Sequence, residues 1–167
     1  MATYAEKVEQ GMKASAGREG KYLTFALAGE EYGISILKVK EIIGMMGITA
    51  VPQTPGFVKG VINLRGKVIP VVDLRLKFGM EAMPYTERTC IVVVEISGSV
   101  GPIMMGIVVD TVSEVLNIKA SEIEDTPTFG VKLNTEFILG MAKMSGAVKI
   151  LLDINRVLTE EEISHLQ

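Results

Sequence analysis

Short runs of apolar and β-branched residues, each closed by a glycine or a polar turn, make up most of the chain. The first run is Tyr22–Leu27, and a second run at Tyr32–Ile36 follows the turn Gly29-Glu30-Glu31. Such runs, bounded by turn residues, predict β-strands. Further strands are predicted at 90–96 and 103–109, and hairpins at 60–74 and 137–154. Short strands at this close spacing favour small β-barrels over a sandwich.

A few segments carry a different signal. Apolar residues between 36 and 43 fall at helical spacing with charged residues between them, which predicts a short amphipathic helix ending at Gly44. The segment Asp110–Val115 suits either a helix or a continued strand. At the C-terminus, Thr159 followed by three glutamates is typical of the start of a helix, here over 159–167. Residues 1–19 are polar and are expected to form a flexible tail.

The chain contains an internal repeat, and a repeat changes the expected fold. Four residues of the middle segment recur 80 positions later: Gly60, Gly66, Val68 and Asp73 match Gly140, Gly146, Val148 and Asp153. Upstream, at a slightly smaller shift, Gly33-Ile34, Val39 and Glu41 match Gly106-Ile107, Val112 and Glu114. We therefore expect two modules, at about 20–80 and 86–158, with allowance for strands that cross between them.

Composition excludes several classes of function. The chain has 167 residues, 48% of them hydrophobic, and a net charge of −3, so nothing drives it towards nucleic acid. No apolar run approaches the roughly 18 residues that span a bilayer, and the N-terminus lacks the apolar stretch of a signal peptide. The single cysteine, Cys90, leaves no internal disulfide. These features predict a cytoplasmic protein without membrane insertion.

Catalytic chemistry is sparse in this sequence. The one histidine, His165, lies near the C-terminus, so the usual general base and most metal sites are missing. Asp73, Asp110 and Asp153 each follow an apolar strand, where they suit hydrogen bonds to turn amides. A hydrolase built on Asp73 and Asp153 remains a remote alternative. We predict no catalytic residue, no metal and no cofactor; ten methionines favour binding instead.

One group of motifs resembles the CheW family of chemotaxis coupling proteins. It is formed by G-V-I-N-L-R-G at 60–66, followed by I-P-V-V-D-L-R at 69–75. The family pattern continues in E-Y-G-I at 31–34 and in G-I-V-V-D at 106–110. The resemblance runs from about Lys21 to Leu158, and the N-L-R-G hairpin at this distance from the E-Y-G-I strand is its most specific part.

The resemblance implies an all-β fold with short helices: two five-stranded SH3-like barrels packed around a shared core, with a short C-terminal helix. It implies a non-catalytic adaptor, monomeric when isolated, that joins the cytoplasmic tip of methyl-accepting chemoreceptors to the regulatory domain of the histidine kinase CheA. Such an adaptor would be recruited to receptor arrays at the inner face of the cell membrane. By residue match, the interaction residues would lie in a groove between the modules and would be Val39, Glu41, Gly60, Asn63, Arg65 and Val115.

Other interpretations of these residues stay open. Val39 and Val115 suit simple core packing as well as partner binding. By position alone Arg65 would be a solvated turn residue, and the family motif favours recognition instead. The chain could also be a CheW-like regulatory module of a larger or hybrid chemotaxis regulator; its own Met1 and capped C-terminal helix favour a stand-alone protein.

Overall fold

The computed structural model describes residues 17–98, 100–126 and 136–158. The helix predicted at 159–167 and all but the last three residues of the predicted N-terminal tail lie outside these ranges. The strands are β1 (Gly20–Leu27), β2 (Glu30–Ser35), β3 (Val39–Gly44), β4 (Val58–Leu64), β5 (Lys67–Asp73), β6 (Cys90–Gly98), β7 (Gly101–Val109), β8 (Thr111–Ile118), β9 (Ile123–Glu124), β10 (Ile138–Met144) and β11 (Ala147–Leu152). Short helices are η1 (Ile36–Lys38), α2 (Leu74–Lys77), η2 (Ala120–Glu122) and α3 (Ile154–Val157).

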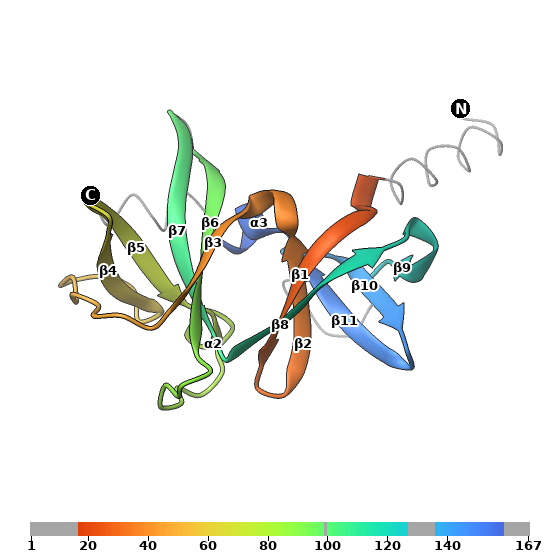
Figure 1. Cartoon of the computed structure of the whole chain (residues 1–167), viewed down its shortest axis with the longest axis horizontal. Helices are drawn as coiled ribbons and strands as arrows, with labels where there is room; N and C mark the ends of the chain where they lie inside the picture. Colours follow the sequence, from red (N-terminus) through yellow and green to blue (C-terminus); the bar gives the residue numbers. More distant parts are fainter. Residues whose placement is uncertain (1–16, 99, 127–135, 159–167) are drawn as a thin grey trace.

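These strands form two curved sheets, which are two SH3-like barrels side by side (Figure 1). Barrel I has the strand order β8-β1-β2-β11-β10-β9, and barrel II has the order β3-β6-β7-β5-β4. Neighbouring strands are antiparallel except where β2 meets β11 and β5 meets β7. The all-β prediction is confirmed; barrel II has the five predicted strands, and barrel I has a sixth of only two residues.

The two barrels exchange strands between the sequence repeats. The hairpin β1–β2 belongs to the first repeat but lies in barrel I, between β8 and β11 of the second repeat. The hairpin β6–β7 of the second repeat lies in barrel II, between β3 and β5 of the first. Each segment, 20–80 and 86–158, therefore contributes strands to both barrels.

The largest core lies where the barrels meet. It joins side chains from β1 and β2, such as Phe25 and Ile34, to others from β6 and β7, such as Val92 and Ile107. Smaller clusters fill the inside of each barrel, around Ile62 in barrel II and Ile118 in barrel I. Because burial of apolar area is the main driving force for folding, the shared core binds the two barrels into one body.

The helix predicted over residues 36–43 is wrong beyond its first turn. Only Ile36–Lys38 form a 3₁₀ turn, and β3 begins at Val39. Alternate residues of β3 are partly buried and exposed, and the strand pairs with β6, with Val39 opposite Val94. β-branched residues favour a strand, and the free edge of β6 supplies the hydrogen bonds that a helix would have made internally. The segment 110–115, open between helix and strand, is a strand from Thr111.

Candidate partner-binding face

The turn between β4 and β5 presents Arg65 to solvent. Arg65 and Gly66 have φ values of 53° and 88°, the left-handed conformation that a two-residue type I′ hairpin turn requires. The Asn63 side chain supports the turn, because its Oδ1 accepts a hydrogen bond from the Gly66 N–H at 2.8 Å. The N-L-R-G motif is thus a compact turn that holds the arginine backbone in one conformation.

Arg65 forms a bidentate ion pair with Glu41 on β3. Its Nη1 donates to Glu41 Oε2 at 2.8 Å, and Nη2 donates to Oε1. The Arg65 side chain is 71% exposed, so much of the guanidinium remains available to a partner. The hydrogen bond from Arg65 is the main reason why the pKa of the Glu41 carboxyl lies below its usual value, so both groups are charged at neutral pH. The pair is therefore an ordered, exposed charge pair at the edge of barrel II.

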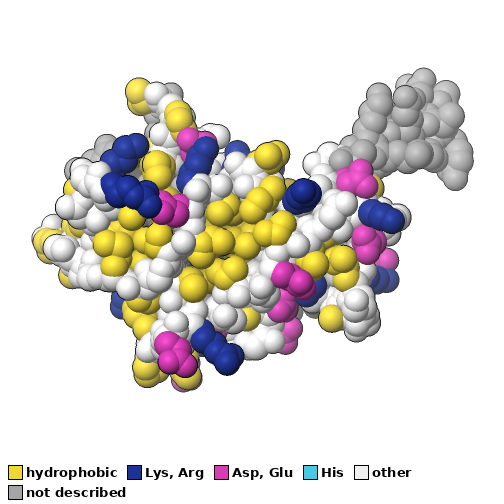
Figure 2. All heavy atoms as spheres, viewed as in Figure 1, with side chains coloured by type: hydrophobic (Ala, Val, Ile, Leu, Met, Phe, Trp, Pro, Cys, Tyr) yellow, Lys and Arg dark blue, Asp and Glu magenta, His cyan; other side chains and the backbone are white. Residues whose placement is uncertain are grey.

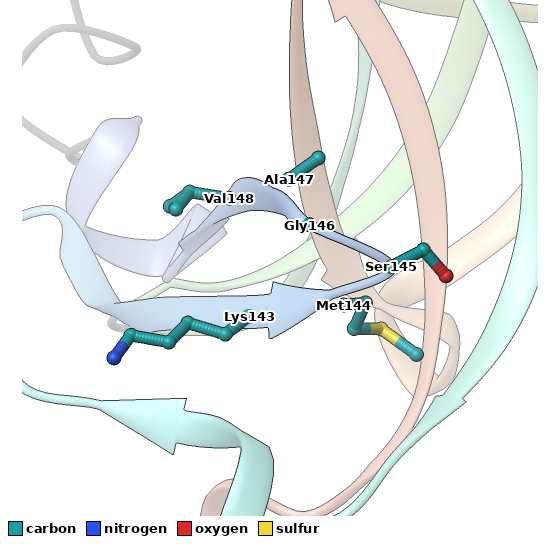
Figure 3. A pocket seen from close by; sticks show the side chains of 6 residues that line it. All are labelled: Lys143, Met144, Ser145, Gly146, Ala147 and Val148. Carbon is teal, nitrogen blue, oxygen red and sulfur yellow. The ribbon is translucent and has the colours of Figure 1, made fainter.

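Among the described residues of the second repeat, no pair is equivalent to this one. Its turn has the same backbone, with φ values of 51° at Ser145 and 77° at Gly146, but a serine carries no charge to offer Glu114, the counterpart of Glu41. Lys143 pairs instead with Glu124 at 2.7 Å and points away from Ser145 (Figure 3). An open pocket of about 270 Å³ lies here, lined only by residues 143–148 of this one hairpin. A small-molecule site usually draws converging polar groups from several elements, which this pocket lacks.

Gly60 has a structural reason to be glycine. Its φ is 139°, and a Cβ atom built on it would lie 2.0 Å from the carbonyl oxygen of Thr49. Thr49 pairs with β4 here as an isolated antiparallel bridge and exchanges two backbone hydrogen bonds of 2.9 Å with Val61. Gly60 therefore permits the backbone at Thr49 to approach β4, the first strand of the hairpin that carries Arg65.

The two predicted valines occupy different environments. Val39 is partly buried against the shared core, which fits the packing interpretation. Val115 lies on β8 in barrel I and is 49% exposed.

β3 and β8 are each an edge strand of their own sheet. Apolar side chains gather in the middle of the molecular face where the barrels meet (Figure 2). We call the surface formed by β3, β8 and the β4–β5 turn the inter-barrel face. Glu41, Asn63 and Arg65 lie together on its barrel II side, and Val115 on its barrel I side.

Sequence reasoning missed a second ion pair, between Arg75 and Asp110. Arg75 Nε donates to Asp110 Oδ1 at 2.7 Å, and Nη2 donates to Oδ2 at 2.6 Å. Asp110 also accepts a hydrogen bond from the backbone N–H of Ala28, as expected for a carboxylate beside a turn. Burial acts to raise the pKa of Asp110, but the bonds from Arg75 and Ala28 outweigh it and hold that pKa below its usual value. The partners are 35 residues apart, so no local spacing could reveal them.

Asp73 and Asp153, the carboxylates of the hydrolase alternative, have the same structural role in the two repeats. Each is the N-cap of a short helix: Asp73 accepts from the N–H of Arg75, and Asp153 from that of Asn155. Asp73 also accepts a hydrogen bond of 3.0 Å from the hydroxyl of Tyr85. Burial, followed by the charge of Asp73, raises the pKa of that phenol. Both carboxylates are thus engaged in holding helix ends.

Within residues 17–98, 100–126 and 136–158, no cluster of three or more His, Cys, Asp or Glu side chains is placed to hold a metal ion. Across the same part of the chain, no helix has the length and apolar character to cross a membrane.

Comparison with known proteins places this geometry in a family. The family model of the CheW-like domain matches residues 21–162. The chemotaxis protein CheW of Klebsiella aerogenes is 43% identical over 144 residues, which are 86% of this chain and 84% of that protein. CheW of Rhizobium meliloti is 33% identical over 148 residues, covering 89% and 92% of the two chains. The crystal structure of the scaffolding protein TtCheW from Thermoanaerobacter tengcongensis superimposes with a TM-score of 0.72 at 38% identity, covering 81% of this chain and 89% of that one. The chain belongs to the CheW-like family.

Proposed function

We propose that this protein is a non-catalytic adaptor of bacterial chemotaxis, which joins the cytoplasmic tip of a methyl-accepting chemoreceptor to the regulatory domain of the histidine kinase CheA. Membership of the CheW-like family supports this role, as do relatives named as chemotaxis proteins and a structural neighbour described as a scaffolding protein. An adaptor of this kind is held at receptor arrays by its partners and not by a membrane segment of its own.

The observation that carries the proposal is the Glu41–Arg65 pair on the inter-barrel face. A guanidinium offers five donors in a planar fork, and Glu41 occupies only one edge of that fork. The remaining donors suit carbonyl or carboxylate oxygens on a receptor helix. Val115, across the face on β8, offers apolar contact to the same helix. Asn63 and Gly60 act indirectly, because they shape the hairpin that presents Arg65.

Kinase binding is assigned to other exposed apolar side chains. Leu37 in η1 is 83% exposed, and Val100 beside the β6–β7 turn is 99% exposed. Both extend from segments that adjoin β6 of barrel II. An apolar contact of this kind depends little on salt, whereas a contact through Arg65 weakens as ionic strength rises.

Isothermal titration calorimetry with each partner separately tests the proposal. The full chain is titrated with the receptor signalling fragment and, in a second series, with the CheA regulatory domain. Both complexes are expected at tens of micromolar protein or below. Leu37→Ser should weaken the kinase complex alone, and Arg65→Ala the receptor complex alone. Absence of binding to both partners would refute the adaptor function, and loss of both complexes with either variant would refute the division of the surface.

A further inference from the structure

We infer that Arg75 and Asp110 form a latch that fixes the angle between the two barrels, and that they are thereby positioning residues for receptor binding at the inter-barrel face. The second part of this inference depends on the proposed function; the first part does not.

Asp110 occupies the point at which the chain passes from one barrel to the other. β7 of barrel II ends at Val109, and β8 of barrel I begins at Thr111, so Asp110 is the only residue between them. Its backbone N–H donates to the carbonyl of Ala26 at 3.1 Å, and its carboxylate accepts from the N–H of Ala28 at 2.9 Å. Asp110 is thus bound to the β1–β2 hairpin of barrel I through both its backbone and its side chain.

Arg75 holds the same carboxylate from the barrel II side. It is the second residue of α2, which follows β5 directly and is capped by Asp73. Asp73 in turn lies opposite Val108 in the parallel pairing of β5 with β7. The two bonds of 2.7 and 2.6 Å join side chains that are only 16% and 30% exposed. Charge-assisted bidentate bonds with little solvent access are among the stronger and more directional polar contacts in proteins.

At the other crossing between the barrels, the described residues form no such ion pair. There the chain passes from β2 to β3 through η1, and the counterpart of Asp110 by the repeat is Leu37, which is 83% exposed. The counterpart of Arg75 is Asn155, whose Oδ1 accepts one neutral hydrogen bond of 2.9 Å from the N–H of Ser97. In the described part of the chain, the charged latch therefore lies at one of the two crossings, the one that leads into β8.

This location connects the latch to partner binding. β8 carries Val115, and β3 carries Glu41, so a change in the angle between the barrels alters the spacing of the two sides of the inter-barrel face. If only a fraction of the molecules holds the two sides of the face at the correct spacing, the apparent affinity for the partner falls in proportion to that fraction. Loosening the latch should thus reduce receptor affinity without removing a contact residue.

Distance measurement by pulsed electron paramagnetic resonance tests the latch directly. Spin labels are placed at Val68→Cys in barrel II and Val148→Cys in barrel I, exposed positions related by the repeat, in a full-length Cys90→Ser background. Arg75→Gln is the main variant, because it leaves the bonds from Asp110 to Ala26 and Ala28 in place. Glu95→Gln, which removes the Lys40–Glu95 pair within barrel II, is the matched control.

We expect one narrow distance distribution in the parent and in Glu95→Gln, a clearly broader one in Arg75→Gln, and an intermediate width in Arg75→Lys. In calorimetry, Arg75→Gln should weaken receptor-fragment binding by roughly three- to tenfold while kinase binding is retained. An unchanged distance distribution in Arg75→Gln overturns the latch. A broader distribution with unchanged receptor affinity overturns the positioning role, and a parent protein that binds no receptor fragment refutes the proposed function while leaving the distance result valid.

Discussion

Glu41 and Arg65 connect the two edges of barrel II. Glu41 lies on β3, at one end of the strand order, and Arg65 follows β4, at the other end, so their bidentate pair spans the opening of the sheet. Family motifs in the sequence indicate both residues, but no sequence pattern predicts their direct contact. The contact explains how an exposed turn arginine is held in a defined orientation.

Replacing Arg65 should affect stability little. Exposed ion pairs contribute little to folding, so Arg65→Ala is expected to change the melting temperature by no more than about 3 °C. Ser145→Ala is the matched control, since Ser145 has the same turn position and nearly the same φ in the second repeat. Differential scanning calorimetry gives both values. A drop of about 10 °C or more in Arg65→Ala alone would show that the pair is structural.

Gly60 should tolerate no side chain. In Gly60→Ala the new Cβ would meet the Thr49 carbonyl oxygen, so either the Thr49–Val61 bridge opens or the strand shifts. We expect a loss of about 3 kcal/mol in the free energy of unfolding, measured by chemical denaturation. Gly66→Ala is the control, because it has a positive φ of 88° but open space around the added carbon. Equal losses in the two variants would show that backbone strain, and not the close approach, requires glycine at 60.

The Asp110 carboxylate should make stability depend on pH at the acid end. Its pKa in the folded protein lies below the ordinary value of 3.8, so its contribution is fully present above that value. The contribution is lost as the pH falls through the lower pKa of the folded state. The stability difference between the parent and Asp110→Asn should therefore be constant from neutral pH to about pH 5 and shrink towards pH 3. Urea titrations across this range would contradict the account if the difference grew on acidification.

The two barrels should unfold together. Each is built from strands of both repeats, and the largest core lies between them. We expect a single calorimetric transition whose van't Hoff and calorimetric enthalpies agree. Two separated transitions, or a protease-resistant fragment that contains one barrel alone, would show that the barrels are independent folding units.

Much of the fold could be predicted from local pattern. The hairpins at 60–74 and 137–154 match β4–β5 and β10–β11, with helices starting at Leu74 and Ile154 after their aspartate caps. Alternating apolar residues and turn glycines form patterns only a few residues long. Strands and turns can therefore be predicted from them without knowledge of tertiary contacts. The pairing of β3 with β6 and of β8 with β1 depends on partners far along the chain. For this reason the local pattern predicts a helix over 36–43 and does not decide between helix and strand over 110–115.

The candidate site was predictable only in part. The unequal turns of the two repeats drew attention to Arg65, and the family motif added Glu41. The Arg75–Asp110 contact depends on α2 and the β7–β8 crossing meeting the β1–β2 hairpin, which follows from the exchange of strands between repeats. The sequence of either module alone therefore does not predict this contact.

The central proposal is that this protein joins receptor to kinase, with the receptor bound at the inter-barrel face, and co-sedimentation tests it most directly. Receptor signalling fragments on vesicles are mixed with CheA and with the parent protein, Arg65→Ala or Ser145→Ala, and pelleted kinase and kinase activity are measured. The account predicts that the parent and Ser145→Ala recruit and activate the kinase, and that Arg65→Ala, although folded, recruits or activates it poorly. Full recruitment and activation by Arg65→Ala, or none by the parent protein, would contradict it.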